Sequence, residues 1–215
     1  SHSLGQRTFV ENIHQLPPAS LITIDPAAPG IRLVQVHRFN FDEKSAAGKS
    51  LRQNVRDLTE CFVQVCRHRA HPHRRNVLSL SGGLDSRTVG AGFHYARIPF
   101  TAVSFQDHAG TARADVQAAR RLARFFQVDW KLIPTGPVTG AHVLRILRLK
   151  SGFAGLSSSF YPEYFDKIRE LFGPDIFYFS GDGGDRVLPD TRPQTKLSSL
   201  DDLVRYITST KILFP

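Results

Sequence analysis

The pattern of apolar and polar positions predicts that strands and helices alternate along most of this chain. Apolar runs typical of buried strands cover residues 76–80, 100–105, 129–133 and 176–179. Apolar residues at helical spacing predict helices over residues 50–67, 85–96, 116–126, 138–150 and 161–172. This alternation predicts an α/β domain with a parallel sheet flanked by helices, in which ligands bind beyond the carboxyl ends of the strands.

The first 45 residues follow a different pattern. Two apolar stretches, at residues 21–25 and 31–41, are separated by Pro29-Gly30 and predict two strands joined by a turn. Two strands do not make a stable domain by themselves. We therefore expect a short β segment over residues 1–45, followed by the α/β domain over residues 46–215.

Composition and charge narrow the class of protein. The chain has 215 residues, of which 41% are hydrophobic and 22% charged, which suits one sizeable core. No apolar run approaches the roughly 18 residues that cross a bilayer, and the N-terminus does not resemble a signal peptide, so we expect a cytoplasmic protein without a membrane partner. The formal charge of +9 fits either nucleic acid or an anionic substrate such as ATP.

The two cysteines and three of the aromatic residues are expected in the core. Cys61 and Cys66 lie five residues apart within a predicted helix, which is not the spacing of a redox or zinc site. Trp130, Phe125 and Phe126 also favour core positions.

Three histidines at positions 68, 71 and 73 superficially suggest a metal site. Four arginines at positions 67–75 surround them and would repel a cation, and no acidic or thiol ligand stands beside them. We interpret this segment as a solvated basic loop.

The segment at residues 78–86, Leu-Ser-Leu-Ser-Gly-Gly-Leu-Asp-Ser, joins a predicted strand to a predicted helix. Gly82 and Gly83 allow unusual backbone dihedrals and close approach to a ligand, and Ser81 and Ser86 offer hydroxyl donors. The N–H groups at the start of the following helix would face an anion. A structural turn that needs glycine is the alternative, but the six specified positions in this context favour a phosphate site.

Asp85 within this segment changes the kind of phosphate site that is expected. A carboxylate would repel phosphate unless a divalent cation lay between them, so Asp85 is a candidate magnesium ligand. The segment therefore predicts a site for metal-bound pyrophosphate.

A second glycine-containing segment, Gly48-Lys49-Ser50, is similar to the end of a Walker A loop. The first glycine of that motif would fall on Glu43, so the match fails. We interpret the segment as the start of a helix, in which Ser50 and Gln53 form a capping box.

A second acidic loop, Phe-Ser-Gly-Asp-Gly-Gly-Asp at residues 179–185, also follows an apolar strand. Asp182 and Asp185 lie three residues apart among glycines, which suits a loop that reaches over a ligand and binds a cation. An ordinary acidic turn or a calcium loop is the alternative. Because both loops follow strands of one parallel sheet, they should open at the same edge.

Together the two loops resemble the PP-loop ATP pyrophosphatases and, among them, the synthetase domain of the asparagine synthetase family of the glutamine-hydrolysing class. That family combines Ser-Gly-Gly-Leu-Asp-Ser with a later Ser-Gly-Glu/Asp-Gly-x-Asp-Glu, which matches residues 76–93 and 176–186 most strongly. The resemblance implies an adenine nucleotide alpha hydrolase-like fold with ATP and Mg2+ as cofactors. It also implies an amide-forming ligase that adenylates a carboxylate, aspartate or an analogue, and releases AMP and pyrophosphate.

The same resemblance assigns roles to individual positions. The ATP and pyrophosphate site would comprise Ser81, Gly82, Gly83, Asp85, Ser86, Val103, Ser180 and Gly181. Val103 and Gly181 would border the adenine. Asp85 and Asp185 would hold magnesium, and Asp182 would be the catalytic residue that orients or deprotonates the incoming amine.

Several departures leave the acceptor open. Arg186 stands where the family has an acidic residue, and residues 187–190 replace an aromatic and Gly-rich continuation. Relatives such as β-lactam synthetases and lasso-peptide cyclases keep the adenylation chemistry and change the acceptor. A PP-loop RNA-modifying enzyme and a non-catalytic nucleotide-binding module are the other two classes that remain open.

The N-terminal Leu-Pro-Pro at residues 16–18, with its two strands, resembles the end of that family's glutaminase domain. The implied partners are a small-molecule carboxylate, ammonia or an amine, and the glutaminase domain of a longer protein; a homodimer remains open, and nucleic acid is not expected. Since residue 1 is Ser1 rather than the family's cysteine nucleophile, and Lys211 does not align with its later catalytic lysine, we expect a truncated synthetase without glutamine-dependent synthesis.

Overall fold

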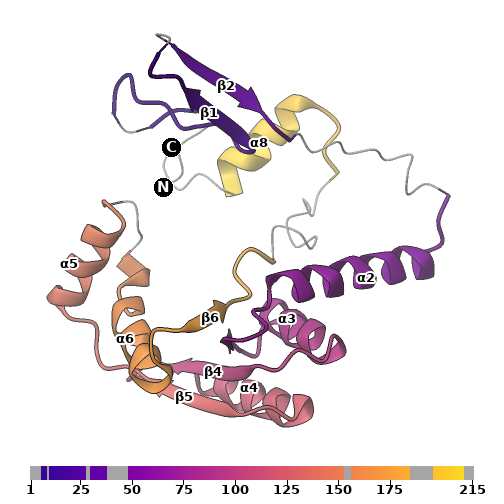
Figure 1. Ribbon diagram of the computed structural model, residues 1–215, viewed down its shortest axis with the longest axis vertical. Helices are drawn as coiled ribbons and strands as arrows, with labels where there is room; N and C mark the ends of the chain where they lie inside the picture. Colours follow the sequence, from indigo (N-terminus) through magenta and orange to yellow (C-terminus); the bar gives the residue numbers. More distant parts are fainter. Residues whose placement is uncertain are drawn as a thin grey trace. The chain divides into compact units, whose positions relative to one another are not determined.

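The computed structural model describes residues 6–8, 10–27, 30–37, 48–152, 156–184 and 196–210 (Figure 1). The chain forms two compact units, one of residues 1–58 with 140–159 and the other of residues 59–139 with 160–215. The expected boundary at residue 45 lies outside the described residues and stays a prediction. None of the helices in the described ranges is long and apolar enough to cross a bilayer.

The first unit contains the expected β hairpin. Strands β1 (Ser20–Ile24) and β2 (Ile31–Gln35) pair antiparallel, with Ser20 opposite Gln35 and Ile24 opposite Ile31. The expected continuation to residue 41 lies beyond the described part of this strand. The unit also holds α5 (Gly140–Leu149) and the 3-10 helix η1 (Leu156–Ser158).

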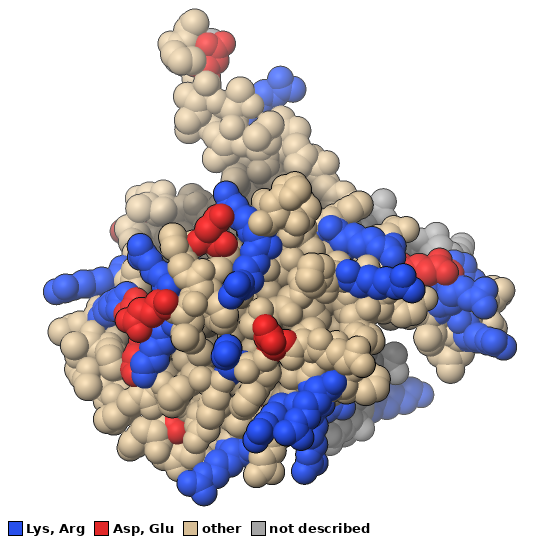
Figure 2. All heavy atoms as spheres, turned by 60° about the horizontal axis from the view of Figure 1, so that its bottom comes forward, with Lys and Arg blue, Asp and Glu red and all other residues tan. Residues whose placement is uncertain are grey.

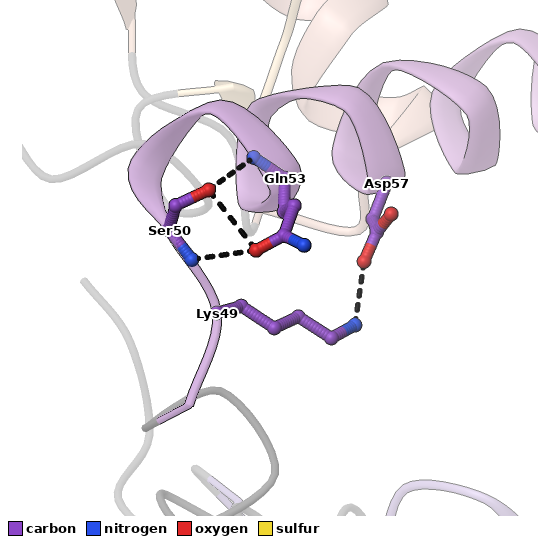
Figure 3. Close-up of polar contacts among 4 residues, drawn as sticks. All are labelled: Lys49, Ser50, Gln53 and Asp57. Carbon is purple, nitrogen blue, oxygen red and sulfur yellow. Dashed lines mark hydrogen bonds and ion pairs between the residues drawn. The ribbon is translucent and has the colours of Figure 1, made fainter.

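Helix α2 (Leu51–Arg69) begins with the expected capping box (Figure 3). The backbone N–H of Gln53 donates to Ser50 Oγ at 3.3 Å, and the N–H of Ser50 donates to Gln53 Oε1 at 2.8 Å. The Nζ of Lys49 lies 2.5 Å from a carboxylate oxygen of Asp57. The Gly-Lys-Ser segment therefore leads into a helix, as the sequence predicts. Its lysine forms an ion pair with Asp57 of that helix.

The apolar face predicted for α2 was mostly wrong, because only Phe62 packs against the core and the other apolar residues at helical spacing, Leu51, Val55, Leu58 and Val65, are exposed. Cys66 is buried and Phe62 packs against the core, but Leu51 is 80% exposed and Cys61 is also exposed. The helix meets α3 at Gly92, where an added Cβ would lie 2.7 Å from Phe62 Cε1 and 2.8 Å from Cys66 Sγ. Residues five apart on a helix point about 140° apart, so only one of the two thiols reaches the core.

The second unit contains a four-stranded parallel sheet in the order β5-β4-β3-β6, which confirms the expected fold class. The strands are β3 (Arg75–Ser79), β4 (Thr101–Gln106), β5 (Trp130–Pro134) and β6 (Ile176–Phe179). The helices described in this unit, besides the end of α2, are α3 (Leu84–Tyr95), α4 (Arg113–Phe126), α6 (Tyr161–Phe172) and α8 (Leu200–Thr210).

Helices cover both faces of this sheet (Figure 1). Successive side chains of a strand point to opposite faces. Leu78 and its neighbours on one face pack with Phe93 of α3 and with α4, and the C-terminal part of α2 joins them. Val77 and its neighbours on the other face pack with Tyr164 and Ile168 of α6. The sheet is thus the middle of three layers.

The aromatic positions expected in the core divide in the same way. Phe126 is buried and Trp130 packs partly buried against the core, as expected. Phe125 is 71% exposed, so the core assignment was wrong for this residue. Adjacent helical residues point about 100° apart, and α4 presents only one of the two rings to the sheet.

The strand order places a topological switch point between β3 and β6. The chain runs outward from β3 through β4 to β5 and then returns to add β6 on the other side of β3. Leu78 lies opposite Phe179, so the two strands end at nearly the same level. The residues after β3 and those after β6 therefore open side by side at one edge, as the sequence predicts.

Candidate functional site

Two serines define the turn between β3 and α3. The buried Ser86 Oγ accepts the N–H of Ser81 at 3.0 Å and lies 2.9 Å from Ser81 Oγ, which in turn accepts the N–H of Gly83 at 3.1 Å. Helix α3 then begins at Leu84 with no side-chain cap. The N–H groups of its first turn therefore have no capping acceptor and are suited to an anion.

Neither glycine of this turn has unusual dihedrals, and Gly82 is required for packing. Gly83 has φ −70° and ψ 159°, which any residue adopts, and Gly82 has no positive φ, so that part of the sequence interpretation was wrong. An added Cβ at Gly82 would lie 2.6 Å from Asp115 Oδ1 and 3.0 Å from Ala118 Cβ. Gly82 thus allows the turn to pack against α4.

The loop after β6 is a tight turn. The N–H of Asp182 donates to Ser180 Oγ at 3.3 Å, and the N–H of Gly184 donates to Gly181 O at 3.2 Å. Gly183 has φ 89°, a left-handed conformation that favours glycine. Asp182 is exposed on this turn.

The two loops contact each other through glycines. A Cβ at Gly181 would collide with the backbone N of Ser86, and a Cβ at Gly184 would lie 2.5 Å from Cγ and 2.7 Å from Oδ1 of Asp85. The structure therefore brings the predicted residues of the two loops together at the start of α3.

Asp85 fits the chemistry of a hard cation. Its half-buried carboxylate receives no hydrogen bond and makes no ion pair with any residue in the described ranges, so its oxygens remain available. Asp185, the other predicted magnesium ligand, lies outside those ranges, and the metal pair stays a prediction. No group of three or more His, Cys, Asp or Glu residues in the described parts could hold a metal ion. Magnesium commonly keeps water and substrate phosphates as ligands, so few protein ligands are needed.

The expected histidine loop is shorter than predicted, because His68 lies in the last turn of α2 and only His71 and His73 lie in the loop before β3. His71 Nδ1 accepts the N–H of His73 at 3.1 Å and that of Arg74 at 3.0 Å, and its ring centroid lies 4.7 Å from that of Phe177. Arg74 also forms an ion pair with Asp175. These contacts give the segment a structural role.

Val103 lies in β4, at the level where β3 ends. It is opposite Ser79 in the sheet, and its carbonyl accepts the N–H of Leu80 at 2.8 Å. Its side chain is 0% exposed and packs in the core beneath α6. Its predicted place beside the adenine stays a prediction.

Three tyrosines near this edge were missed by the sequence interpretation. Tyr164 OH lies 3.4 Å from both Ser79 Oγ and Tyr178 OH. Burial raises the pKa of Tyr161 and of Tyr178, and the negative charge of Asp182 raises both pKa values further. Tyrosines three residues apart on α6, with another just before the acidic loop, were the available signal.

Basic side chains gather on the outer surface of the second unit. Arg113, Arg120, Arg121 and Arg124 are exposed on α4, and none forms an ion pair with an acidic residue in the described ranges. Figure 2 shows groups of lysine and arginine side chains on one face of the molecule, with fewer acidic side chains among them. This charge suits an anionic ligand without identifying it.

No protein-family model and no curated protein matches the sequence. Among solved structures, the chain is similar to an NMN synthetase from Francisella tularensis, with 18% identity, a TM-score of 0.37, and coverage of 60% of this chain and 53% of that one. It is also similar to an NH3-dependent NAD synthetase from Campylobacter jejuni, in complex with the nitrate ion, with 18% identity, a TM-score of 0.42, and coverage of 62% and 58%. The chain thus spans little more than half the length of either protein. Similarities this low carry no argument about activity, and the assignment of function rests on the residues and contacts of the site.

Proposed function

We propose that this chain binds magnesium ATP between the loop after β3 and the loop after β6, as the ATP site of a ligase that activates a carboxylate by adenylation. The observation that supports this most is the packing of Gly181 and Gly184 against Ser86 and Asp85. This packing brings the loop after β6 against the uncapped N–H groups at the start of α3 and against the Asp85 carboxylate, which has no partner among the described residues. Both groups lie at the topological switch point of the sheet.

The first half of the reaction follows from these groups. The pyrophosphate part of ATP would lie at the start of α3, where the backbone N–H groups bind its oxygens. A carboxylate oxygen of the substrate attacks the α-phosphorus, the new O–P bond forms, the α,β-bridging P–O bond breaks, and pyrophosphate leaves. Magnesium held by Asp85, and by Asp185 outside the described residues, would neutralise the charge that builds on pyrophosphate.

The second half of the reaction uses Asp182. An amine or ammonia attacks the acyl carbon, the C–N bond forms, and the bond from that carbon to the AMP oxygen breaks. The exposed carboxylate of Asp182 would orient the amine or accept its proton. Aspartate or an analogue is the carboxylate that the asparagine synthetase resemblance suggests. In a longer cytoplasmic protein, a glutaminase domain would supply ammonia.

An RNA-modifying enzyme is the second candidate, because the exposed arginines of α4 add an anion-binding surface. Such an enzyme would share the phosphate loop, but its pyrophosphate release would depend on RNA. The two functions therefore differ in which molecule stimulates turnover.

The test is ATP–pyrophosphate exchange by the intact protein across a panel of carboxylates, because exchange reports adenylation without needing the amine. We expect exchange with at least one carboxylate and its loss in Asp85→Asn. Asp57→Asn, which removes an exposed carboxylate of α2, is the matched control and should retain exchange. Magnesium ATP binding without exchange for any carboxylate would instead indicate a non-catalytic module, and exchange that requires RNA would favour the second candidate.

A further inference from the structure

Four aromatic rings form a continuous stack beside the acidic loop. Ring centroids lie 4.3 Å apart for Phe105 and Phe160, 4.4 Å for Phe160 and Tyr161, and 5.8 Å for Tyr161 and Phe165, with interplanar angles of 34°, 30° and 23°. We call these four residues the aromatic ladder. Tyr178 forms a T-shaped pair with the last ring, with 5.0 Å between the centroids of Phe165 and Tyr178.

The aromatic ladder lies at the carboxyl edge of the sheet. Phe105 is the second-last residue of β4, and Tyr161 is the first residue of α6. Tyr164, one turn into α6, reaches Ser79 at the end of β3, whereas Phe172 at the other end of the helix packs near Ile176 at the start of β6. Helix α6 therefore runs back from this edge, and its first turn lies beside the loop that carries Asp182.

The aromatic ladder keeps ring surface accessible to a ligand. Phe165 is 41% exposed, and the other three rings are only partly buried against the core beneath α6. A purely structural stack would gain more from complete burial, since apolar area removed from water stabilises the fold. The exposed part of this stack is available to a flat or apolar molecule.

The charge around the aromatic ladder favours a cation. The faces of aromatic rings attract ammonium groups. Asp182 is an exposed carboxylate on the turn that follows β6, four residues after Tyr178, and its negative charge raises the pKa of both Tyr161 and Tyr178. Lys167 is the basic residue two positions after Phe165. Its Nζ lies 2.8 Å from Glu163 Oε1 in an ion pair and donates to the carbonyl oxygen of Pro134 at 2.6 Å. A carboxylate ligand would meet repulsion at the Asp182 end of the stack, whereas an organic ammonium group would be attracted.

We propose that the aromatic ladder and Asp182 bind the second substrate, and that this substrate is an organic amine with an aromatic or apolar body. The assignment rests on the proposed ligase function. The amine binds as its ammonium form, loses a proton to Asp182 or water, and attacks the acyl carbon with its free electron pair. The C–N bond replaces the bond from that carbon to the AMP oxygen, and AMP leaves.

Direct binding tests this site without requiring turnover. Saturation-transfer NMR titrations of the full chain with benzylamine, benzyl alcohol, phenylacetate and ammonium chloride compare a cationic, a neutral and an anionic aromatic probe with the bare cation. We expect benzylammonium to bind tightest, about two- to five-fold tighter than benzyl alcohol, because a cation over an aromatic face adds that much at a partly exposed site. Ammonium chloride and phenylacetate should bind more weakly than benzylammonium.

Variants identify the groups responsible. Asp182→Asn should weaken benzylammonium about ten-fold, as expected for loss of a charge-assisted hydrogen bond, and should leave benzyl alcohol nearly unchanged. Phe165→Leu keeps the apolar bulk while removing the ring, so it should abolish the preference for the cation in a folded protein. Leu171→Ala, an exposed apolar truncation near the far end of α6, is the control and should bind like the wild type.

Two results would overturn the inference. One is equal affinity for benzylammonium and benzyl alcohol in the wild type, and the other is unchanged benzylammonium affinity in both Asp182→Asn and Phe165→Leu. Carboxylate-dependent ATP–pyrophosphate exchange, measured on the same samples, separates this failure from failure of the proposed function. If ATP–pyrophosphate exchange occurs but the probes show no selectivity for the amine, only the amine site is contradicted. If the amine is bound selectively but no exchange occurs, only the adenylation is contradicted.

Discussion

Gly184 lies directly against the carboxylate of Asp85, so that a Cβ at position 184 would stand 2.5 Å from Cγ and 2.7 Å from Oδ1. Asp85 belongs to the first turn of α3, and Gly184 belongs to the loop after β6. Two segments about 100 residues apart in the chain thus meet at one carboxylate. Any side chain at Gly184 must displace that carboxylate or move the loop.

Gly181→Ala should separate the two loops. Its new methyl group would collide with backbone atoms of Asp85 and Ser86, which cannot turn aside as a side chain can. We expect a loss of about 1–3 kcal/mol in the free energy of unfolding, together with weaker magnesium ATP binding. Thermal denaturation and calorimetric titration measure the two effects. Gly140→Ala is the control, because nothing in the described structure lies within 4 Å of its added Cβ.

Asp85→Asn should relax the metal dependence of ATP binding. Two like charges about 4 Å apart repel by roughly 4 kcal/mol at an effective dielectric near 20, so the wild type should bind ATP only with a divalent cation. The amide removes that repulsion along with the metal ligand. Calorimetry with and without magnesium tests this, and equally tight binding of ATP to the wild type in both conditions would contradict the metal bridge.

Ser86→Ala should loosen the phosphate turn. The substitution leaves the N–H of Ser81 without its acceptor in a partly buried place, which costs about 1–3 kcal/mol of stability. Thr88→Ala is the control on the same helix, because its hydroxyl only donates back to Leu84 O at 2.9 Å. Chemical denaturation should show a larger loss for Ser86→Ala, and ATP affinity should fall only in that variant. Similar losses in both variants would contradict a special role for Ser86.

The two thiols should differ in reactivity. Cys61 is exposed and Cys66 is buried, and burial raises the pKa of the Cys66 thiol above its ordinary value. A thiol reagent in excess should therefore modify Cys61 in the folded protein and Cys66 only after unfolding. Mass spectrometry of labelled peptides distinguishes the two sites, and equal labelling rates in the folded protein would contradict the packing of α2.

The same burial gives a pH dependence of stability. Since the folded pKa of Cys66 is raised, its contribution to stability is fully present below the pKa of the unfolded thiol. It is lost as the pH rises toward the folded pKa. Denaturation followed from about pH 7 to about pH 10 should show a loss in the wild type that Cys66→Ala reduces and Cys61→Ala does not. Identical pH profiles for the two variants would contradict this linkage.

Any RNA affinity should be weak and electrostatic. The exposed arginines of α4 supply charge, but the sequence has no recognisable base-reading motif beside them. We expect binding of a single-stranded RNA to fall steeply with salt, with a slope of log affinity against log salt near −0.7 for each phosphate contacted. Arg121→Ala should make that slope shallower by the amount expected for about one phosphate contact. RNA binding that is insensitive to salt and selective for one sequence would favour the RNA-modifying function over the carboxylate ligase.

Local chemistry in the sequence was sufficient for the elements from α2 to β6 and for the order in which they occur, whereas α8 was not predicted. Short apolar runs and period-3.6 patterns identified the parallel-sheet domain, because the strands are covered on both faces and the helices on one. Ser50 and Gln53 identified a helix start since both partners of that hydrogen-bond pair are close in the chain. The glycine loops after β3 and β6 were recognisable for the same reason.

Only the tertiary structure decided which residues meet. Gly82 is required by Asp115 of α4, and Gly184 by Asp85, and no local pattern specifies such distant contacts. The rotation of α2 about its axis, set by its contact with Gly92, buried Cys66 and left Cys61 exposed. The aromatic ladder is likewise assembled from β4 and the start of α6, which become neighbours only when the sheet and its covering helix pack together. Local hydrogen bonding and periodicity act over a few residues, whereas packing brings together residues that are far apart in the chain. The candidate site depends on this long-range packing.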